Sequence, residues 1–287
     1  MYDKVKLWCF LSEEEKRRLM ERHDATPTFD KDTLVGCKFF DGNISVQCYK
    51  SKCSIVASLP KVLKPSNIEP LRREEIAEAV QIIGEVVEQK AEFLRVSSVE
   101  LFNAWDMEHA PIEYFCRLGD AGRYMPREQD GTTLYYGRLL SRPKKVLCFY
   151  DKSVECMERH GILMAGNILR YELRLNGRLG EYGITTLSDL LRPSVAQYLE
   201  GNYKAEYDRI TKINVSDMEK NKDAAIQFWG ARHPDEVSEF FKLQRERRDL
   251  TSVQRYRNKC AIEELLASGK DDLIAELDAK VEGTRWA

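Results

Sequence analysis

The stretch 142–175, RPKKVLCFYDKSVECMERHGILMAGNILRYELRL, contains the two predicted strands from which the rest of the interpretation follows. The first, over 144–151, ends at Tyr150, where charged residues begin. After a charged helical segment, the second strand carries a glutamate between two arginines. Because successive side chains point to opposite faces of a strand, the charged residues of the second strand should lie on one face and its apolar residues on the other. One face then holds Arg170, Glu172 and Arg174, and the other holds Leu169, Tyr171, Leu173 and Leu175.

This pattern has two interpretations. Spacing alone is more typical of a core or rim tyrosine at Tyr150, with its hydroxyl hydrogen-bonded, and of an ion-paired strand face around Glu172. The other interpretation is a phosphoryl-transfer centre, in which Glu172 holds a divalent cation and the arginines hold phosphates. The place of Tyr150 at a strand end favours this second one, because strand ends present side chains to substrates. Glu100, in a predicted strand over 93–102, could converge on the same ion.

Basic residues near the tyrosine could line a groove for a nucleic-acid backbone, or could face solvent. They are Arg138, Arg142, Lys144, Lys145 and Lys152. The later run RERRDLTSVQRYRNK, over 245–259, is either a second DNA contact or the surface of a salt-bridged helix.

Composition excludes several classes of protein. Of the 287 residues 43% are hydrophobic and 32% charged, which is typical of a folded chain. The net charge of -2 gives no global attraction to nucleic acid. We expect an intracellular protein without membrane spans, because no long apolar run or signal peptide is found. The absence of Walker, GxGxxG and GxSxG motifs argues against ATPases, Rossmann enzymes and serine hydrolases. The 8 cysteines are scattered singly, without zinc spacing, and should be reduced and mostly buried.

Hydrophobic periodicity predicts an α+β fold, with a mostly antiparallel central sheet, helices packed on one side of it, and a helical carboxy-terminal region. Strands are expected at 2–10, 34–40, 44–49, 53–59, 93–102 and 132–137, in addition to the two opening strands. Helices are expected at 12–20, 71–90, 111–118, 185–200, 202–211, 215–229, 234–247, 251–268 and 270–282. Turns or loops are expected at 24–33, 60–70 and 119–131, and no internal repeat is visible. Residues 1–184 should form a catalytic domain and 185–287 a separate helical region.

Four segments resemble replication initiators of the phage and plasmid gene II/X class, which are related to filamentous-phage rolling-circle initiators. They are FYDKSVE (149–155), ILRYELRL (168–175), SIVASLPKVLKPSNI (54–68) and GTTLYYG (131–137). The likeness spans roughly 35–190 and is most specific at the first two segments. It implies an enzyme that nicks and rejoins one DNA strand at an origin through a 5'-phosphotyrosine, and leaves a free 3'-hydroxyl.

Carried over by position, the resemblance implies that Tyr150 is the nucleophile and Lys152 its neighbour in the active site. It makes Glu172 a carboxylate of a metal site for Mg²⁺ or Mn²⁺, with Glu100 as a second carboxylate. Val154 stands where related plasmid initiators can have a second tyrosine, which argues for a single nucleophile.

The expected DNA contacts are Lys144, Lys145, Arg170 and Arg174. The expected partners are single-stranded or melted origin DNA and a host helicase and polymerase, without a membrane, in the cytoplasm of a bacterial host. The helical region could read the origin or recruit the helicase.

Two other functions compete with this interpretation. One is a non-catalytic module for single-stranded nucleic acid, with an RRM-like sheet on which Tyr135, Tyr136 and Tyr150 stack against bases. The other is a carboxylate-metal hydrolase in which Tyr150 is structural.

Overall fold

The computed structural model of the chain describes residues 1–30, 33–115, 117–122, 125–130, 132–213 and 272–286. The strands are β1 (Tyr2–Phe10), β2 (Thr26–Asp30), β3 (Thr33–Asp41), β4 (Ile44–Tyr49), β5 (Lys52–Ser58), β6 (Arg95–Met107), β7 (Arg127–Asp130), β8 (Thr133–Tyr136), β9 (Lys145–Asp151) and β10 (Asn167–Leu175).

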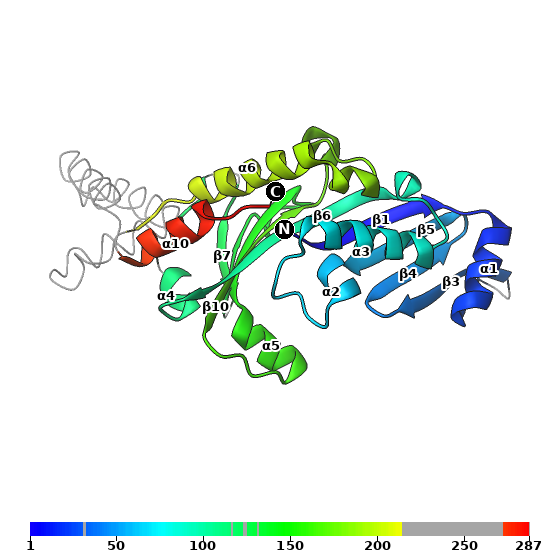
Figure 1. Ribbon diagram of the computed structural model, residues 1–287, viewed down its shortest axis with the longest axis horizontal. Helices are drawn as coiled ribbons and strands as arrows, with labels where there is room; N and C mark the ends of the chain where they lie inside the picture. Colours follow the sequence, from blue (N-terminus) through cyan, green and yellow to red (C-terminus); the bar gives the residue numbers. More distant parts are fainter. Residues whose placement is uncertain (31–32, 116, 123–124, 131, 214–271, 287) are drawn as a thin grey trace, which may run out of the picture.

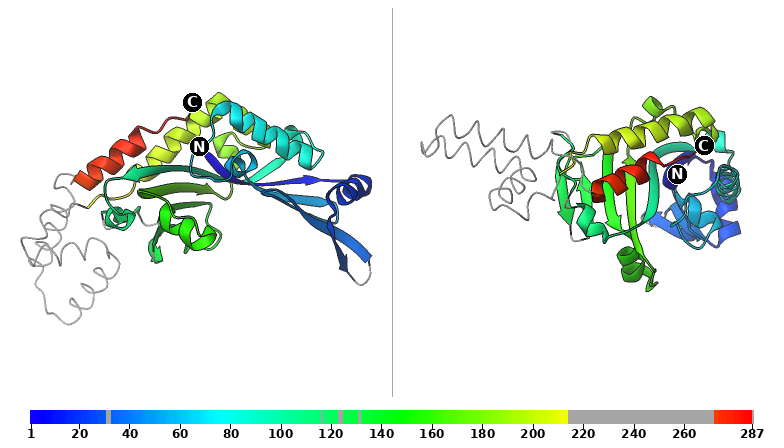
Figure 2. Two further views of the ribbon diagram at one scale, coloured as in Figure 1. Left: turned by 60° about the horizontal axis from the view of Figure 1, so that its bottom comes forward. Right: turned by 60° about the vertical axis from the view of Figure 1, so that its left-hand side comes forward.

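The helices are α1 (Glu13–His23), α2 (Leu59–Leu63), α3 (Arg73–Val86), α4 (Pro111–Phe115), α5 (Lys152–His160), α6 (Pro193–Asp208) and α10 (Asp272–Glu282). Short 3-10 helices are η1 (Ala91–Phe93), η2 (Leu179–Tyr182) and η3 (Leu187–Leu191). Helices α3, α6 and α10 lie on one side of the sheet, and α5 lies on the other (Figure 1, Figure 2). Within the described residues, no helix combines the length and apolarity that crossing a bilayer requires.

All ten strands join one antiparallel sheet in the order β2-β3-β4-β5-β1-β6-β10-β9-β8-β7. The sheet consists of two halves with the same strand order, which meet where β1 pairs with β6. Outward from this seam the first half runs β1-β5-β4-β3-β2 and the second runs β6-β10-β9-β8-β7. A helix follows the first strand of each half, α1 or α4. The two halves repeat the order in which their strands pair. Strand pairing is not visible as a repeated sequence pattern, so the sequence did not reveal this repeat.

The predicted fold class is confirmed, and most of the predicted strands and the long helix form. The prediction that the helices pack on one side was wrong for α5, which lies on the opposite side of the sheet from α3, α6 and α10 (Figure 2). The capping box at α1 also forms, because Ser12 Oγ accepts from the Glu15 amide and the Glu15 carboxylate accepts from the Ser12 amide. Three loop predictions were wrong at β2, α2 and β7. Both strands lie at sheet edges and have no apolar alternation, so pairing with a neighbour, and not local pattern, makes them strands. Helix α2 has its proline at the start, where a helix tolerates it.

The predicted helical region is described only in part. Helix α10 agrees with the helix predicted at 270–282. In place of the helices predicted at 185–200 and 202–211, the structure has the short η3 and one continuous helix, α6, so the predicted break near residue 201 was wrong. The apolar side chains of α6 and α10 join the same core as the sheet, including Leu199, Tyr203 and Leu277. The helices predicted at 215–229, 234–247 and 251–268, and the basic run at 245–259, lie outside the described residues. The boundary at residue 184 stays a prediction.

Four cysteines that are far apart in the sequence form a row across neighbouring strands of the first half. The opposed pairs are Cys37 with Cys48, Cys48 with Cys53, and Cys53 with Cys9. All four are free and buried, as expected of reduced thiols. The four side chains lie on four neighbouring strands, so their sulfurs are spread along a line and cannot surround one metal ion. In the described part of the chain, the group with three mutually close metal-ligand atoms lies elsewhere.

Two tyrosines connect α6 to the middle of the second half. The Tyr171 hydroxyl donates to the Tyr203 carbonyl at 3.2 Å, and the Tyr203 hydroxyl donates to the Tyr171 carbonyl at 3.0 Å. Their rings lie 4.3 Å apart between centroids, and both side chains are fully buried. This contact fixes the helix-covered face of β10 and leaves the other face of that strand open for polar chemistry.

Replacement of this contact should destabilise the fold. We expect Tyr203→Ala to lower the free energy of unfolding by about 3–5 kcal/mol, because a large buried ring leaves a cavity. Tyr203→Phe should cost about 1 kcal/mol, the net value of one hydrogen bond. Urea unfolding followed by circular dichroism measures both. Tyr198→Ala, on the same helix but 53% exposed, is the control and should change stability little. Equal losses at both positions would contradict the docking of α6 through Tyr203.

Candidate active site

Three neighbouring strands bring most of the predicted site residues onto one face of the second half. In the register of β9, β10 and β6, Arg170 lies opposite Tyr150, and Arg174 lies opposite Glu100. Glu172 lies between these pairs on β10. The alternation predicted for β10 therefore holds, and its charged residues face away from the helix-covered core.

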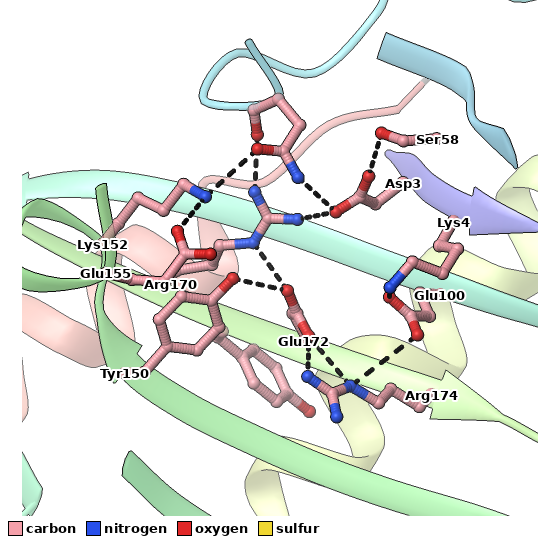
Figure 3. Close-up of polar contacts among 12 residues, drawn as sticks. Asp3, Lys4, Ser58, Glu100, Tyr150, Lys152, Glu155, Arg170, Glu172 and Arg174 are labelled. Atoms are coloured by element: carbon pink, nitrogen blue, oxygen red, sulfur yellow. Dashed lines mark hydrogen bonds and ion pairs between the residues drawn. The ribbon is translucent and has the colours of Figure 1, made fainter. Parts of the chain in front are cut away.

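Glu172 is the centre of the hydrogen-bond network (Figure 3). Its Oε1 accepts from the Tyr150 hydroxyl at 2.8 Å and from Arg170 Nε at 2.8 Å. Its Oε2 accepts from Arg174 Nε at 2.9 Å and from Arg174 Nη2 at 2.6 Å. The side chain is almost completely buried. The glutamate is thus held by two arginines and a tyrosine.

Arg170 connects Glu172 to a second carboxylate, Asp3. Its Nη2 donates to Asp3 Oδ2, its Nη1 donates to the Asn67 carbonyl at 2.5 Å, and its guanidinium lies 3.8 Å from the Phe102 ring centroid. Arg170 has no solvent-exposed surface. Each of its side-chain nitrogens donates to a protein acceptor, so Arg170 positions the carboxylates of Asp3 and Glu172.

Lys152 lies at the start of α5, beside Tyr150. Its ammonium donates to Glu155 Oε2 at 2.5 Å and to Asn67 Oδ1 at 3.1 Å, and it lies 6.0 Å from the Tyr150 ring centroid. The Asp151 side chain caps α5 by accepting from the amides of Ser153 and Val154. The cap fixes the turn that carries the lysine back toward the tyrosine.

The charges in the network shift the pKa values in opposite directions. Burial opposes ionisation of Glu172, but Arg170 and Arg174 outweigh it and lower its pKa to about 2. Burial, and then the negative charge of Glu172, raise the pKa of Glu100. The same two causes raise the pKa of Tyr150 well above its ordinary value. In the resting state the site therefore contains an ionised glutamate and a neutral phenol.

Three carboxylates form a group that suits a hard cation. Asp3, Glu100 and Glu172 each offer one oxygen, and these oxygens lie within 4.8 Å of one another. Oxygen donors are the ligands that Mg²⁺ and Mn²⁺ prefer. Glu100 has the loosest partners of the three, with Lys4 at 3.9 Å and Arg174 at 4.0 Å. The residues fit such an ion, with Glu100 as the donor least committed to protein partners.

The structure places Lys144 and Lys145 apart from this group. Lys144 is exposed at the start of the β9 segment. Lys145 points to the helix-covered side, where its ammonium donates to Glu206 of α6 at 2.5 Å. Arg170 and Arg174, in contrast, belong to the network.

A pocket of about 510 Å³ opens beside the network and extends over both halves of the sheet. From the second half it is lined by Tyr135, Tyr150, Glu172 and Arg174, and from the first half by Lys4, Phe40, Asn43 and Ser58, among others. A ligand in this pocket would contact the candidate tyrosine and the first half of the sheet together.

Sequence analysis missed Asp3, Asn67 and Tyr135 as site residues. Strict alternation along β1 places Asp3 with the core residues Val5 and Leu7. The register of β1 against β6 shifts between Tyr2 and Val5, and this bulge redirects the aspartate toward the site. Asn67 lies in a loop and has no periodic signal. For Tyr135 the sequence predicts only base stacking in the competing, non-catalytic function.

A comparison with known proteins shows the family of the chain. Residues 115–258, just over half of the chain, match the model of a family described as replication initiation factor. The chain belongs to this family. The expectation of a replication initiator is therefore confirmed, and the matched segment of this replication initiation factor contains Tyr135, Tyr150 and Glu172. No curated protein matches the chain.

One solved structure is a remote likeness, the rolling circle replication initiator protein from Geobacillus stearothermophilus. It is 12% identical to this replication initiation factor, with a TM-score of 0.43, and the alignment covers 77% of this chain and 89% of that chain.

The low pKa of Glu172 makes stability depend on pH. Its pKa of about 2 lies below the ordinary value of 4.5, so its contribution is fully present above about pH 4.5 and is lost as the pH falls toward 2. This difference corresponds to roughly 3 kcal/mol. We expect Glu172→Gln to remove that part of the acid dependence, as measured by urea unfolding from pH 6 to pH 3. Glu181→Gln, at an exposed position, should keep the wild-type profile; identical profiles in all three proteins would disprove the assignment.

Proposed function

We propose that this replication initiation factor starts rolling-circle replication by nicking one DNA strand and joining the 5'-phosphate to a tyrosine. The observation that carries the proposal is the Tyr150 hydroxyl, held 2.8 Å from a buried carboxylate beside a three-carboxylate group and a pocket. The phenol oxygen attacks the phosphorus, the bond from phosphorus to the 3'-oxygen breaks, and that oxygen takes up a proton. Because the phosphotyrosine conserves the bond, the strand can be rejoined without ATP.

Tyr150 is the proposed nucleophile, and its proton goes to Glu172. A carboxylate with a pKa of about 2 is a weak base, so the resting network holds the phenol neutral. Arg174 is 31% exposed, whereas Arg170 is fully buried, so Arg174 is the arginine that can turn toward a phosphate in the pocket. Its departure would remove two hydrogen bonds from Glu172 and raise the basicity of that carboxylate. Binding of the scissile phosphate would thus activate the tyrosine.

Lys152 and the carboxylates complete the proposed machinery. The ammonium of Lys152, which is paired with Glu155 at 2.5 Å and lies 6.0 Å from the Tyr150 ring centroid, would favour the phenolate form of Tyr150 through its positive charge. Glu100, with Asp3 and Glu172, would hold Mg²⁺ or Mn²⁺, and a divalent cation there would polarise the scissile phosphate. Lys144 and Lys145 remain proposed DNA contacts, and Lys145 would have to leave Glu206 to act as one. A host polymerase would extend the 3'-hydroxyl, and a host helicase would open the duplex ahead of it.

Tyr135 is a second candidate nucleophile, because it lines the same pocket from the neighbouring strand β8. Burial and Cys148 raise its pKa, but the positive charges of Arg174 and Arg138 act in the opposite direction. Arg138 lies 4.4 Å from its ring centroid. For Tyr150, the charge of Glu172 adds to the effect of burial, Arg170 opposes both, and the pKa is raised well above its ordinary value. The negative charge of Glu172 thus disfavours ionisation of Tyr150 relative to Tyr135, whereas the hydrogen bond to Glu172 favours proton transfer from Tyr150.

A covalent adduct assay tests the proposal and decides between the tyrosines. The protein is incubated with single-stranded or supercoiled origin DNA and Mn²⁺, and the adduct is separated under denaturing conditions. We expect adduct from wild type and at least a thousandfold loss in Tyr150→Phe, because the nucleophile is removed. Tyr136→Phe is the control, since Tyr136 is buried with its hydroxyl bound to the Gly119 carbonyl.

Each other outcome of this assay identifies a different function. Loss of adduct in Tyr135→Phe with retention in Tyr150→Phe would assign the nucleophile to Tyr135. Cleavage without adduct would favour the carboxylate-metal hydrolase. Binding of single-stranded DNA without cleavage would favour the RRM-like module and overturn the proposal.

The carboxylate group predicts a specific effect on metal binding. We expect Glu100→Gln to weaken Mn²⁺ binding at least tenfold, because it removes the donor least engaged with protein partners. Isothermal titration calorimetry measures the affinity. Glu158→Gln is the matched control, since Glu158 lines the same pocket outside the three-carboxylate group. Equal affinities in wild type and Glu100→Gln would exclude this group as the metal site.

A further inference from the structure

The first half of the sheet repeats the strand order of the catalytic half but carries different side chains on the corresponding face. Val5, Leu7 and Cys9 of β1 are buried toward the helices, so the alternating residues of that strand point to the other side. Lys6 pairs with Ser98 of β6, and Lys4 reaches Glu100 at 3.9 Å. This outer face is therefore continuous with the face that carries the candidate active site.

Lysines and aromatic residues dominate this outer face. We call it the lysine–aromatic face, and it consists of Lys4, Lys6, Trp8, Phe10, Lys38, Phe40, Tyr49 and Lys52. Phe10 and Phe40 are 66% and 64% exposed, and Tyr49 is 48% exposed. No carboxylate occupies an outward position in the strand segments that form this face. These segments are Lys4 to Phe10 of β1, all of β4 and β5, and 36–40 of β3. Large exposed aromatic side chains without acidic neighbours are unusual on a monomer surface and indicate a binding surface.

Lysines and rings contact one another within the strands and between neighbouring strands. Lys52 Nζ lies 5.2 Å from the Trp8 ring centroid, Lys38 Nζ lies 4.9 Å from that of Phe40, and Trp8 packs edge-on against Phe10 at 5.4 Å. Such an arrangement offers ring faces to bases and ammonium groups to phosphates along one line. It combines the two features by which proteins hold single-stranded nucleic acid.

The pocket connects this face to the candidate active site. Lys4, Phe40, Asn43 and Val56 from the first half line the same cavity as Tyr150. Six strand spacings separate β3 from β9, which is about 29 Å at about 4.8 Å per spacing. A strand with its scissile phosphate at the tyrosine would thus continue over the lysine–aromatic face.

We propose that the lysine–aromatic face binds the unpaired DNA that flanks the nick, by base stacking and phosphate contacts without reading sequence. The inference rests on the proposed function, since it places the scissile strand in the pocket. Unpaired DNA fits better than duplex DNA, because rings can stack only on bases that are free of their partners. It also fits better than a second copy of the chain, because a two-fold contact through this face would bring like-charged lysines together.

Fluorescence anisotropy with a labelled oligo-dT of about 16 nucleotides tests the stacking. We expect Phe10→Ala/Phe40→Ala to weaken binding about tenfold or more. Phe93→Ala is the matched control, because Phe93 is 62% exposed but lies on η1, outside the face. Since both target rings are solvent-exposed, circular dichroism and thermal unfolding should stay as in wild type. Unchanged affinity in the double variant would overturn the proposal.

The salt dependence of the same binding tests the phosphate contacts. Each lost phosphate contact to single-stranded DNA should lower the slope of log affinity against log salt by about 0.7. We therefore expect Lys6→Gln/Lys52→Gln to lower the slope by about 1.4, and Lys90→Gln, outside the face, to leave it unchanged. An unchanged slope in the double variant would argue against the proposal.

Two further measurements separate this inference from its alternatives. If sedimentation shows that Phe10→Ala/Phe40→Ala dissociates an oligomer while DNA affinity is unchanged, the face is a contact between copies and the proposal is wrong. Loss of binding in the face variants, with no adduct from wild type, would refute the nicking reaction and retain the DNA-binding face.

Discussion

The buried guanidinium of Arg170 is the interaction on which the site depends. It lies between Asp3 of β1 and Glu172 of β10, so one side chain joins the two halves of the sheet across the central strand β6. Two carboxylates this close would repel each other in a buried site, and one would take up a proton. With Arg170 between them, Glu172 stays ionised and accepts a hydrogen bond from the Tyr150 hydroxyl. A buried ion pair contributes little net stability, but removal of one partner is costly.

The two arginines beside Glu172 have different tasks because they differ in burial. Arg170 is enclosed and fixes geometry, whereas Arg174 is partly exposed and holds Glu172 by two hydrogen bonds at the edge of the pocket. Under the proposed function, a phosphate entering the pocket would compete with Glu172 for Arg174. The same side chain would then keep the site inactive without DNA and release the carboxylate when DNA arrives. Regular alternation along one strand supplies both arginines.

The sequence predicted the fold class, and it predicted which candidate residues share a face of the sheet, because both follow from alternation. Glu172, Arg170, Arg174, Tyr150 and Glu100 lie on regular strands, and their shared face follows from period two. Asp3 was missed because a bulge breaks the period of β1, and Asn67 because a loop has no period. The edge strands β2 and β7 were missed because pairing with a neighbour determines them. Lys145 shares the parity of the core residues of β9, and its contact with Glu206 depends on where α6 packs.

The repeated topology explains how one sheet can combine catalysis and binding. Each half has a face opposite α3, α6 and α10, and the seam between β1 and β6 makes these faces continuous. In the second half that face carries carboxylates, arginines and tyrosines, and in the first half it carries lysines and aromatic rings. A catalytic site alone would hold a single phosphate weakly. A lysine–aromatic platform on the same rigid sheet would hold several more nucleotides at a fixed distance from the tyrosine, and so set which phosphate it meets.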